Sequence, residues 1–241
     1  MLQKALSQLL DVQIEIADQH PLSGGCISEV SVVTMTSADT SRPLPLVRNR
    51  GDGDPATVVV KRNSAAMEEN FRCEAAGLRA IHDAGSIRVP IVHATGRIGD
   101  HAYLVIEWIR STADRPGQNL FERFGRELAE LHKVTAGRQV GWQCNNFLGS
   151  APQLNPSGVS WPAFFAEYRI GFQIKWASDQ GLATESLKSD CELIAKQMDD
   201  LLAGRDDSTS LIHGDLWSGN YLFDDQQQPV LLLSLIHISE P

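Results

Sequence analysis

The most informative segment of the chain is Leu211 to Phe223, with the sequence LIHGDLWSGNYLF. Apolar residues lead to His213 and Asp215, four residues follow, and Asn220 stands directly before a second apolar segment. The spacing His-x-Asp-x-x-x-x-Asn is typical of a phosphotransferase catalytic loop, in which a carboxylate orients the acceptor hydroxyl and an amide oxygen holds magnesium. Asp215 and Asn220 are therefore candidates for these tasks. The alternative is an aspartate in a turn and an asparagine that caps a strand.

A lysine and a glutamate upstream fit the same chemistry. Lys61 ends the apolar strand Val58-Val59-Val60, in the position of a lysine that pairs with nucleotide phosphates. Glu74 follows thirteen residues later in an expected helix, beside a core face, where a buried carboxylate needs a charged partner. We expect Lys61 and Glu74 to pair. In isolation, each is also compatible with a solvated charge.

A glycine-rich turn precedes both residues. The sequence LSGGC, residues 22–26, connects two expected strands. Backbone amides at Gly24, Gly25 and Cys26 can approach a phosphate closely, as anion-binding loops require. A Gly-Gly pair is also usual in a plain hairpin.

The coarse order of elements predicts an α+β, bilobal chain. A β-rich N-lobe, residues 1–109, is expected to bind nucleotide, and a mainly helical C-lobe, residues 110–241, to carry catalysis and substrate binding. The linker is RSTADRPGQ, residues 110–118. At this junction, backbone groups of Glu107, Trp108 and Ile109 are candidates for hydrogen bonds to adenine. The expected strands cover 29–35, 58–60 and 102–109, and the expected helices 65–84, 120–134, 161–179 and 187–202.

Composition excludes several function classes. The 241 residues are 42% apolar and 21% charged, with a net charge of −9, which argues against nucleic acid or an anionic membrane as partner. No secretory signal and no apolar run of the roughly 20 residues that span a bilayer is present. The four cysteines lie far apart without a CxxC pair. We expect a cytoplasmic protein.

The sequence resembles the fructosamine kinase (ketosamine-3-kinase) family, within the wider aminoglycoside-phosphotransferase and protein-kinase-like fold. HGDLWSGN (213–220) is more specific than the generic superfamily form, and NNFLGSAPQLN (145–155) and WPAFFAEYRI (161–170) separate the chain from aminoglycoside and choline kinases. The other matching stretches are LSGGCIS (22–28), EAAGL (74–78), IRVP (87–90) and GRELAELH (125–132).

The resemblance implies an ATP-dependent kinase that phosphorylates the 3-hydroxyl of a ketosamine, on a small amine or on a glycated protein lysine. By position, Asp215 is then the catalytic base and Asn220 a Mg²⁺ ligand. Lys61, paired with Glu74, holds the ATP phosphates. Trp217 either faces the sugar or anchors the core. His213 is interpreted as a loop-bracing hydrogen-bonder.

The C-terminus departs from the family pattern, because the strand that starts at Pro229 is expected to end in Asp-Pro, and no Asp follows Asp225. Residues 234–241 (SLIHISEP) resemble translated adapter sequence and are expected to be non-native, with the fold incomplete beyond them. Two other functions stay open: a catalytically impaired, pseudokinase-like nucleotide-binding protein, and a kinase of the aminoglycoside or choline type.

Overall fold

The computed structural model describes residues 1–22, 28–39, 42, 44–46, 55–111, 118–137, 139–149, 151–204 and 209–233. By its contacts the chain forms two compact units, one made of Met1–Leu128 with His213–Pro241 and the other of Ala129–Ile212. The stretches 110–128 and 213–241, which the sequence assigns to the second lobe, are thus grouped with the first unit. The loop around Asp215 therefore belongs to the same unit as Lys61 and Glu74.

A five-stranded antiparallel sheet organises the first unit, with the strand order β1-β2-β3-β5-β4. The β-branched run Val58-Val59-Val60 pairs with residues 107, 106 and 105, which fixes the register of the two central strands. The strand bounds are Ile14–Pro21 (β1), Glu29–Ser37 (β2), Ala56–Ser64 (β3), Val92–Ile98 (β4) and His101–Glu107 (β5).

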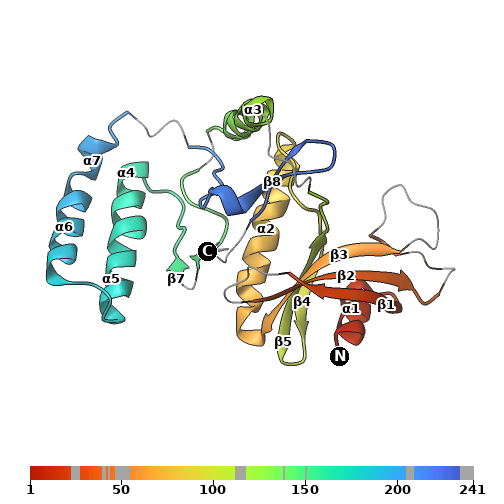
Figure 1. Cartoon of the computed structure of the whole chain (residues 1–241). Coiled ribbons are helices and arrows are strands. Elements are labelled where there is room, and N and C mark those ends of the chain that lie inside the picture. The colour runs from red at the N-terminus through yellow and green to blue at the C-terminus, as the bar shows by residue number, and fades with distance from the viewer. Residues whose placement is uncertain are drawn as a thin grey trace. The chain divides into compact units, whose positions relative to one another are not determined.

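Two helices cover this sheet (Figure 1). Helix α1 (Leu2–Leu10) packs Leu6 into a core with Val58 and Val60 of β3. Because side chains alternate along a strand, Val59 and Lys61 point to the opposite face. Helix α2 (Glu68–Ala84) covers that face, after the short η1 turn (Ala65–Met67), and it ends at Gly85 in the left-handed conformation.

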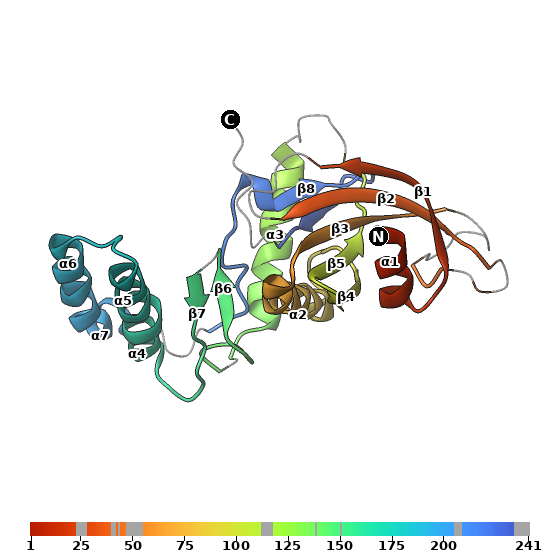
Figure 2. The same ribbon diagram turned by 90° about the horizontal axis from the view of Figure 1, so that it is seen from below.

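A small hairpin completes the first unit (Figure 2). Strands β8 (Tyr221–Phe223) and β9 (Pro229–Leu231) are antiparallel and follow the short η4 turn (Ser218–Asn220). Helix α3 (Gln118–Val134) packs Phe121 edge-on against Tyr221 and Phe223. The strand predicted to start at Pro229 is confirmed as β9.

The second unit is mainly helical. Helix α4 (Trp161–Phe164) begins at Ser160, whose hydroxyl accepts the amide of Ala163, and continues through a π-helical stretch, η2 (Phe165–Gly171), into α5 (Phe172–Asp179). Thr184 caps α6 (Glu185–Lys196) in the same way. The remaining elements are α7 (Met198–Leu201) and the hairpin of β6 (Asn146–Leu148) and β7 (Ala151–Gln153). The helical segments predicted for 161–179 and 187–202 are thus confirmed.

Among the described residues, no helix combines the length and the apolar character needed to cross a bilayer.

Candidate active site

The predicted pair of Lys61 and Glu74 is confirmed. The Nζ atom of Lys61 lies 2.5 Å from Oε1 of Glu74, and the carboxylate is completely shielded from solvent. Burial raises the pKa of Glu74, and the charge and hydrogen bond of Lys61 oppose that rise. The second oxygen, Oε2 of Glu74, is buried without a hydrogen-bond partner. Lys61 therefore holds a carboxylate that would otherwise be costly to bury.

The loop from His213 to Asn220 closes on itself through side chains. The ring Nε2–H of His213 donates to the carbonyl of Leu232 at 2.8 Å, and Nδ1 accepts the amide of Asp215 at 3.2 Å. These two bonds require the neutral ring with its proton on Nε2. Burial lowers the pKa of His213, in agreement with that form, while the bond to Leu232 and the charge of Asp215 oppose the shift. His213 braces the loop. Gly214, at a φ of 87°, supplies the left-handed turn between His213 and Asp215.

Asp215 and Asn220 face each other across this loop. The side-chain Nδ2 of Asn220 donates to the carbonyl of Asp215 at 2.6 Å and to its carboxylate Oδ2 at 3.0 Å. Both amide protons are therefore used, and the side-chain oxygen Oδ1 of Asn220 is buried without a partner. A buried, unsatisfied oxygen next to a carboxylate suits a hard divalent cation, which prefers oxygen ligands.

The metal donor set is small in the part of the chain that the structure describes. In that part, no group of three or more His, Cys, Asp or Glu residues could hold a metal ion. The unpaired oxygen of Asn220 is the candidate ligand in this loop, so a magnesium ion there would need further oxygen ligands, for which phosphate oxygens are suited. The sequence indicates Asp224 as a turn residue. Its carboxylate accepts hydrogen bonds from the amides of Gln226 and Gln228 in the β8–β9 turn and does not contribute to the Asp215–Asn220 pair.

The segment that follows β9 connects the two halves of the candidate site. The amide of Leu232 donates to the carbonyl of Asn220 at 2.9 Å, and the next carbonyl, that of Leu233, lies 3.4 Å from Nζ of Lys61. A single dipeptide therefore contacts both the Asp215 loop and the Lys61–Glu74 pair. The first unit thus contains a base candidate, an orphaned oxygen and a lysine ammonium joined by direct contacts.

Trp217 lies over the backbone of the same loop. A Cβ atom placed on Gly219 would lie 2.5 Å from the indole carbons of Trp217, so only glycine fits beneath the ring. The indole Nε1–H is buried and has no hydrogen-bond partner. The indole ring thus packs against the loop backbone at Gly219 and has one N–H group without a hydrogen-bond acceptor. Both interpretations of Trp217 from the sequence, as a sugar contact and as a core anchor, are compatible with this position.

The segment predicted to contact adenine begins at the end of β5. The amide of Glu107 already donates to the carbonyl of Ile91 at 2.8 Å, and its carboxylate binds Arg88. An adenine contact of Glu107 is therefore restricted to its carbonyl. Trp108 and Ile109 follow the strand, and Ile109 is buried. The predicted phosphate-loop residues Gly24, Gly25 and Cys26 lie outside the described residues.

Sequence reasoning missed the ion pairs of Arg88. This guanidinium joins Glu107, predicted for the adenine segment, to Asp224 of the β8–β9 turn. The only signal in the sequence was the stretch IRVP (87–90), in which buried Ile87 and Val89 alternate with Arg88. An arginine in such a position is also usual on a solvated strand.

The family model and the similar proteins of known name point to the same family. The family model described as fructosamine kinase matches residues 1–233. A probable ketoamine kinase of Synechocystis sp. is 33% identical over 227 residues, which cover 94% of this chain and 69% of that protein. A chloroplastic protein-ribulosamine 3-kinase of Arabidopsis thaliana is 33% identical over 74% of this chain, and the match spans 54% of that relative.

Solved structures resemble the chain along nearly its whole length. A putative fructosamine-3-kinase from Thermobifida fusca superposes with a TM-score of 0.73 at 27% identity, covering 99% of this chain and 74% of the other. One from Haemophilus somnus gives a TM-score of 0.76 at 24% identity, covering 99% and 72%. The predicted α+β, kinase-like fold is thus confirmed.

Proposed function

Because the chain belongs to the fructosamine kinase family, we propose that it derives from an ATP-dependent kinase for the 3-hydroxyl of ketosamines. The acceptor is a small ketosamine or a sugar adduct on a protein lysine. The observation that carries this proposal is the contact chain from Asp215 through Asn220, Leu232 and Leu233 to Lys61. It joins the proposed general base to the lysine proposed to bind phosphate, within one compact unit.

Asp215 is proposed as the general base. Asn220 donates to one carboxylate oxygen of Asp215 and to its carbonyl, which fixes the direction of the carboxylate. An acceptor hydroxyl near that carboxylate is oriented for attack and loses its proton to Asp215. Trp217, on the same loop, offers a ring face and an unsatisfied N–H to a sugar.

Lys61 is proposed to bind ATP phosphates. Its ammonium is held by Glu74 on one side and by a carbonyl on the other, so its position is set before a nucleotide arrives. Gly24, Gly25 and Cys26 are proposed to add backbone amides around the phosphates. The carbonyl of Glu107 and the backbone of Trp108 and Ile109 are proposed to contact adenine.

The side-chain oxygen Oδ1 of Asn220, which is buried and unpaired, is proposed as a ligand of a Mg²⁺ ion. Asn220 would hold the ion there, and the chemistry that magnesium would supply is positive charge that offsets charge on the terminal phosphates. A neutral amide oxygen is a weak ligand for a hard dication, so a magnesium ion at this position would need further oxygen ligands.

The experiment compares two chains with ATP, Mg²⁺ and a ribulosamine. One is the 241-residue chain, and the other has residues 234–241 replaced by the corresponding C-terminal segment of the Synechocystis relative. Circular dichroism first shows that both are folded. We expect ATP binding by both chains and phosphorylated ribulosamine from the chain that carries the relative's segment. No turnover by either chain would refute the kinase assignment.

A second function, nucleotide binding without transfer, is favoured by one observation. The described residues hold no cluster of three or more His, Cys, Asp or Glu residues suited to a metal. The same two-chain assay separates this function, because a pure binding protein gains no turnover when the C-terminal segment is supplied. Trp217 and the segment NNFLGSAPQLN (145–155) distinguish the chain from aminoglycoside and choline kinases. Aminoglycosides and choline are included in the assay as alternative acceptors. A cytoplasmic location stays a prediction from the sequence.

A further inference from the structure

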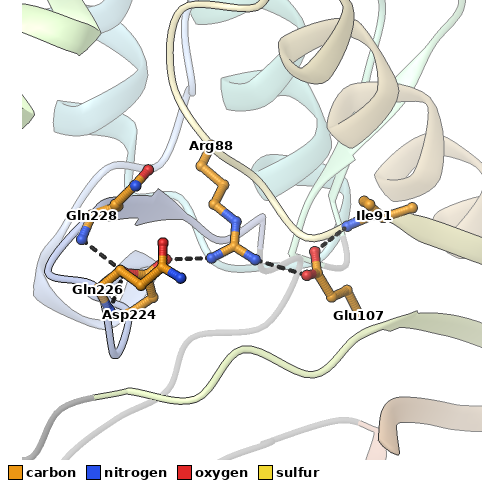
Figure 3. A network of polar contacts seen from close by, with 6 residues as sticks. All are labelled: Arg88, Ile91, Glu107, Asp224, Gln226 and Gln228. Atoms are coloured by element: carbon orange, nitrogen blue, oxygen red, sulfur yellow. Dashed lines mark hydrogen bonds and ion pairs between the residues drawn. The ribbon is translucent and has the colours of Figure 1, made fainter. Parts of the chain in front are cut away.

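Arg88 occupies a point where three segments of the first unit meet (Figure 3). Its guanidinium nitrogen Nη2 lies 2.7 Å from Oε1 of Glu107, and Nη1 binds Oδ2 of Asp224. The backbone of Arg88 is also engaged, because its carbonyl accepts the amide of Leu231 at 2.8 Å beside an isolated parallel bridge to Val230. Arg88 thus contacts the end of β5 with one nitrogen, the β8–β9 turn with the other, and β9 with its main chain.

The carboxylates of Glu107 and Asp224 also accept hydrogen bonds from backbone amides. The second oxygen of Glu107, Oε2, accepts the amide of Ile91 at 3.2 Å. The second oxygen of Asp224, Oδ1, accepts the amides of Gln226 at 3.0 Å and Gln228 at 2.8 Å. Backbone amides therefore orient each carboxylate independently of Arg88. The planar guanidinium of Arg88 then donates to two acceptors that are already oriented.

These contacts bracket the segment predicted to hold adenine. Glu107 is its first residue, and Ser111, four residues later, forms an isolated antiparallel bridge with Asp224. The two carboxylates that bind Arg88 thus stand at the two ends of the stretch 107–111. Asp224 lies in the same hairpin as β8, which follows directly on Asn220. A shift of the Arg88 side chain would change the spacing between this stretch and the Asp215 loop.

We propose that Arg88 is a positioning residue for adenine recognition, which holds the backbone of residues 107–111 at a set distance from the catalytic-loop hairpin. The inference rests on the proposed nucleotide site. Arg88 need not touch the nucleotide itself. Without the guanidinium, two carboxylates face each other, and that of Asp224 is nearly buried, with 4% of its side chain exposed. Their repulsion separates the two segments.

The test measures two ligands and one backbone property. ATP and inorganic tripolyphosphate are titrated against the parent chain, Arg88→Gln and the control Arg72→Gln, which removes an exposed arginine paired with Glu69 on α2. We expect Arg88→Gln to bind ATP about tenfold more weakly than the parent, a loss of affinity typical of one broken contact between two residues. Its affinity for tripolyphosphate should equal that of the parent. Arg72→Gln should match the parent with both ligands.

Hydrogen exchange without ligand provides the second readout. The amides of residues 108–111 should exchange faster in Arg88→Gln than in the parent, while those of β2 should not change. If Arg88→Gln does not fold, Glu107→Gln replaces it in the test, because it weakens the contact with Arg88 but keeps an oxygen for the Ile91 amide. We expect a smaller loss of ATP affinity and a smaller rise in exchange at residues 108–111 in this variant. Arg88→Lys, with one nitrogen in place of two, should lie between the parent and Arg88→Gln.

The outcomes separate this inference from the proposed function. Equal loss of ATP and tripolyphosphate would show a general structural role and overturn the inference, as would unchanged ATP affinity or unchanged exchange at residues 108–111. If the parent binds no ATP, the proposed nucleotide site fails and the assignment to adenine fails with it. The exchange data would then still decide whether Arg88 fixes the spacing of the two segments.

Discussion

The side-chain amide of Asn220 donates both of its protons to Asp215, one to the backbone carbonyl at 2.6 Å and one to the carboxylate at 3.0 Å. Its oxygen is left buried and unpaired. One residue therefore orients the proposed base and presents an oxygen ligand. This double use explains why an amide side chain, with a donor end and an acceptor end, suits this position better than a carboxylate.

Asn220→Asp should make the stability of the loop depend on magnesium. The variant replaces two donated hydrogen bonds by a carboxylate facing Asp215, which we expect to cost about 1–3 kcal/mol without a cation. Added Mg²⁺ should then raise the melting temperature more than in the parent. Gln226→Glu, which adds an acid in the nearby β8–β9 turn, is the control. A similar magnesium response in both variants would argue against a cation at Asn220.

Lys61→Met should destabilise the first unit strongly, because it leaves the carboxylate of Glu74 buried and unpaired. Breaking one partner of a buried pair typically costs about 3–5 kcal/mol. The double variant Lys61→Met with Glu74→Leu should recover most of that loss in urea unfolding. If the single and double variants are equally unstable, the charge on Glu74 is not the source of the cost.

Asp215→Asn, made in the chain with the longer C-terminal segment, should keep the fold and ATP binding and lose transfer to a ribulosamine. Asparagine has nearly the same shape but cannot accept the hydroxyl proton, and loss of a general base costs about 10²–10⁴-fold in rate. Single-turnover kinetics with ATP and Mg²⁺ give the rate. Near-parent turnover would remove Asp215 from the role of base.

His213 should make the protein less stable in acid. Burial lowers its pKa below the ordinary 6.5, so between the two values the unfolded chain binds a proton that the folded chain does not. This contribution to stability is present above pH 6.5 and is lost as the pH falls toward the lowered value. The stability deficit of His213→Asn relative to the parent should therefore shrink as the pH falls.

Urea unfolding at a series of pH values measures this effect. His93, whose pKa burial also lowers, contributes a slope of the same sign, so His93→Asn serves as a comparison. A deficit of His213→Asn that is constant with pH would show that His213 acts without a change in protonation.

Gly219→Ala should displace the Trp217 ring, because the added methyl group would lie 2.5 Å from indole carbons. Overpacking of this kind typically costs about 1–3 kcal/mol. In Trp217→Ala the obstacle is absent, so the same glycine substitution should then cost little. Thermal unfolding of the two single variants and the double variant measures the coupling, and additive losses would refute the contact.

The sequence identified most residues of the candidate site because their arrangement depends on local spacing. The interval from Asp215 to Asn220 spans one loop, and the order of strand lysine and helix glutamate predicts the pairing of Lys61 with Glu74. The pairing is confirmed, since alternation along β3 turns Lys61 toward the face that α2 covers, where Glu74 lies within hydrogen-bond distance. The proposed roles in catalysis and nucleotide binding stay predictions.

What the sequence did not supply are contacts between segments distant along the chain. Strand β4 was not predicted, because its mixed composition gives no clear alternation and only pairing with β5 defines it. Arg88 and Asp224 are separated by 136 positions, and no local pattern relates them. Likewise, the unpaired oxygen of Asn220 becomes evident only once every neighbour is placed. The sequence determined which groups are present and their local order. The tertiary structure alone decided which of them are held by partners and which are left unsatisfied, because hydrogen-bond satisfaction of a buried atom depends on all segments packed around it.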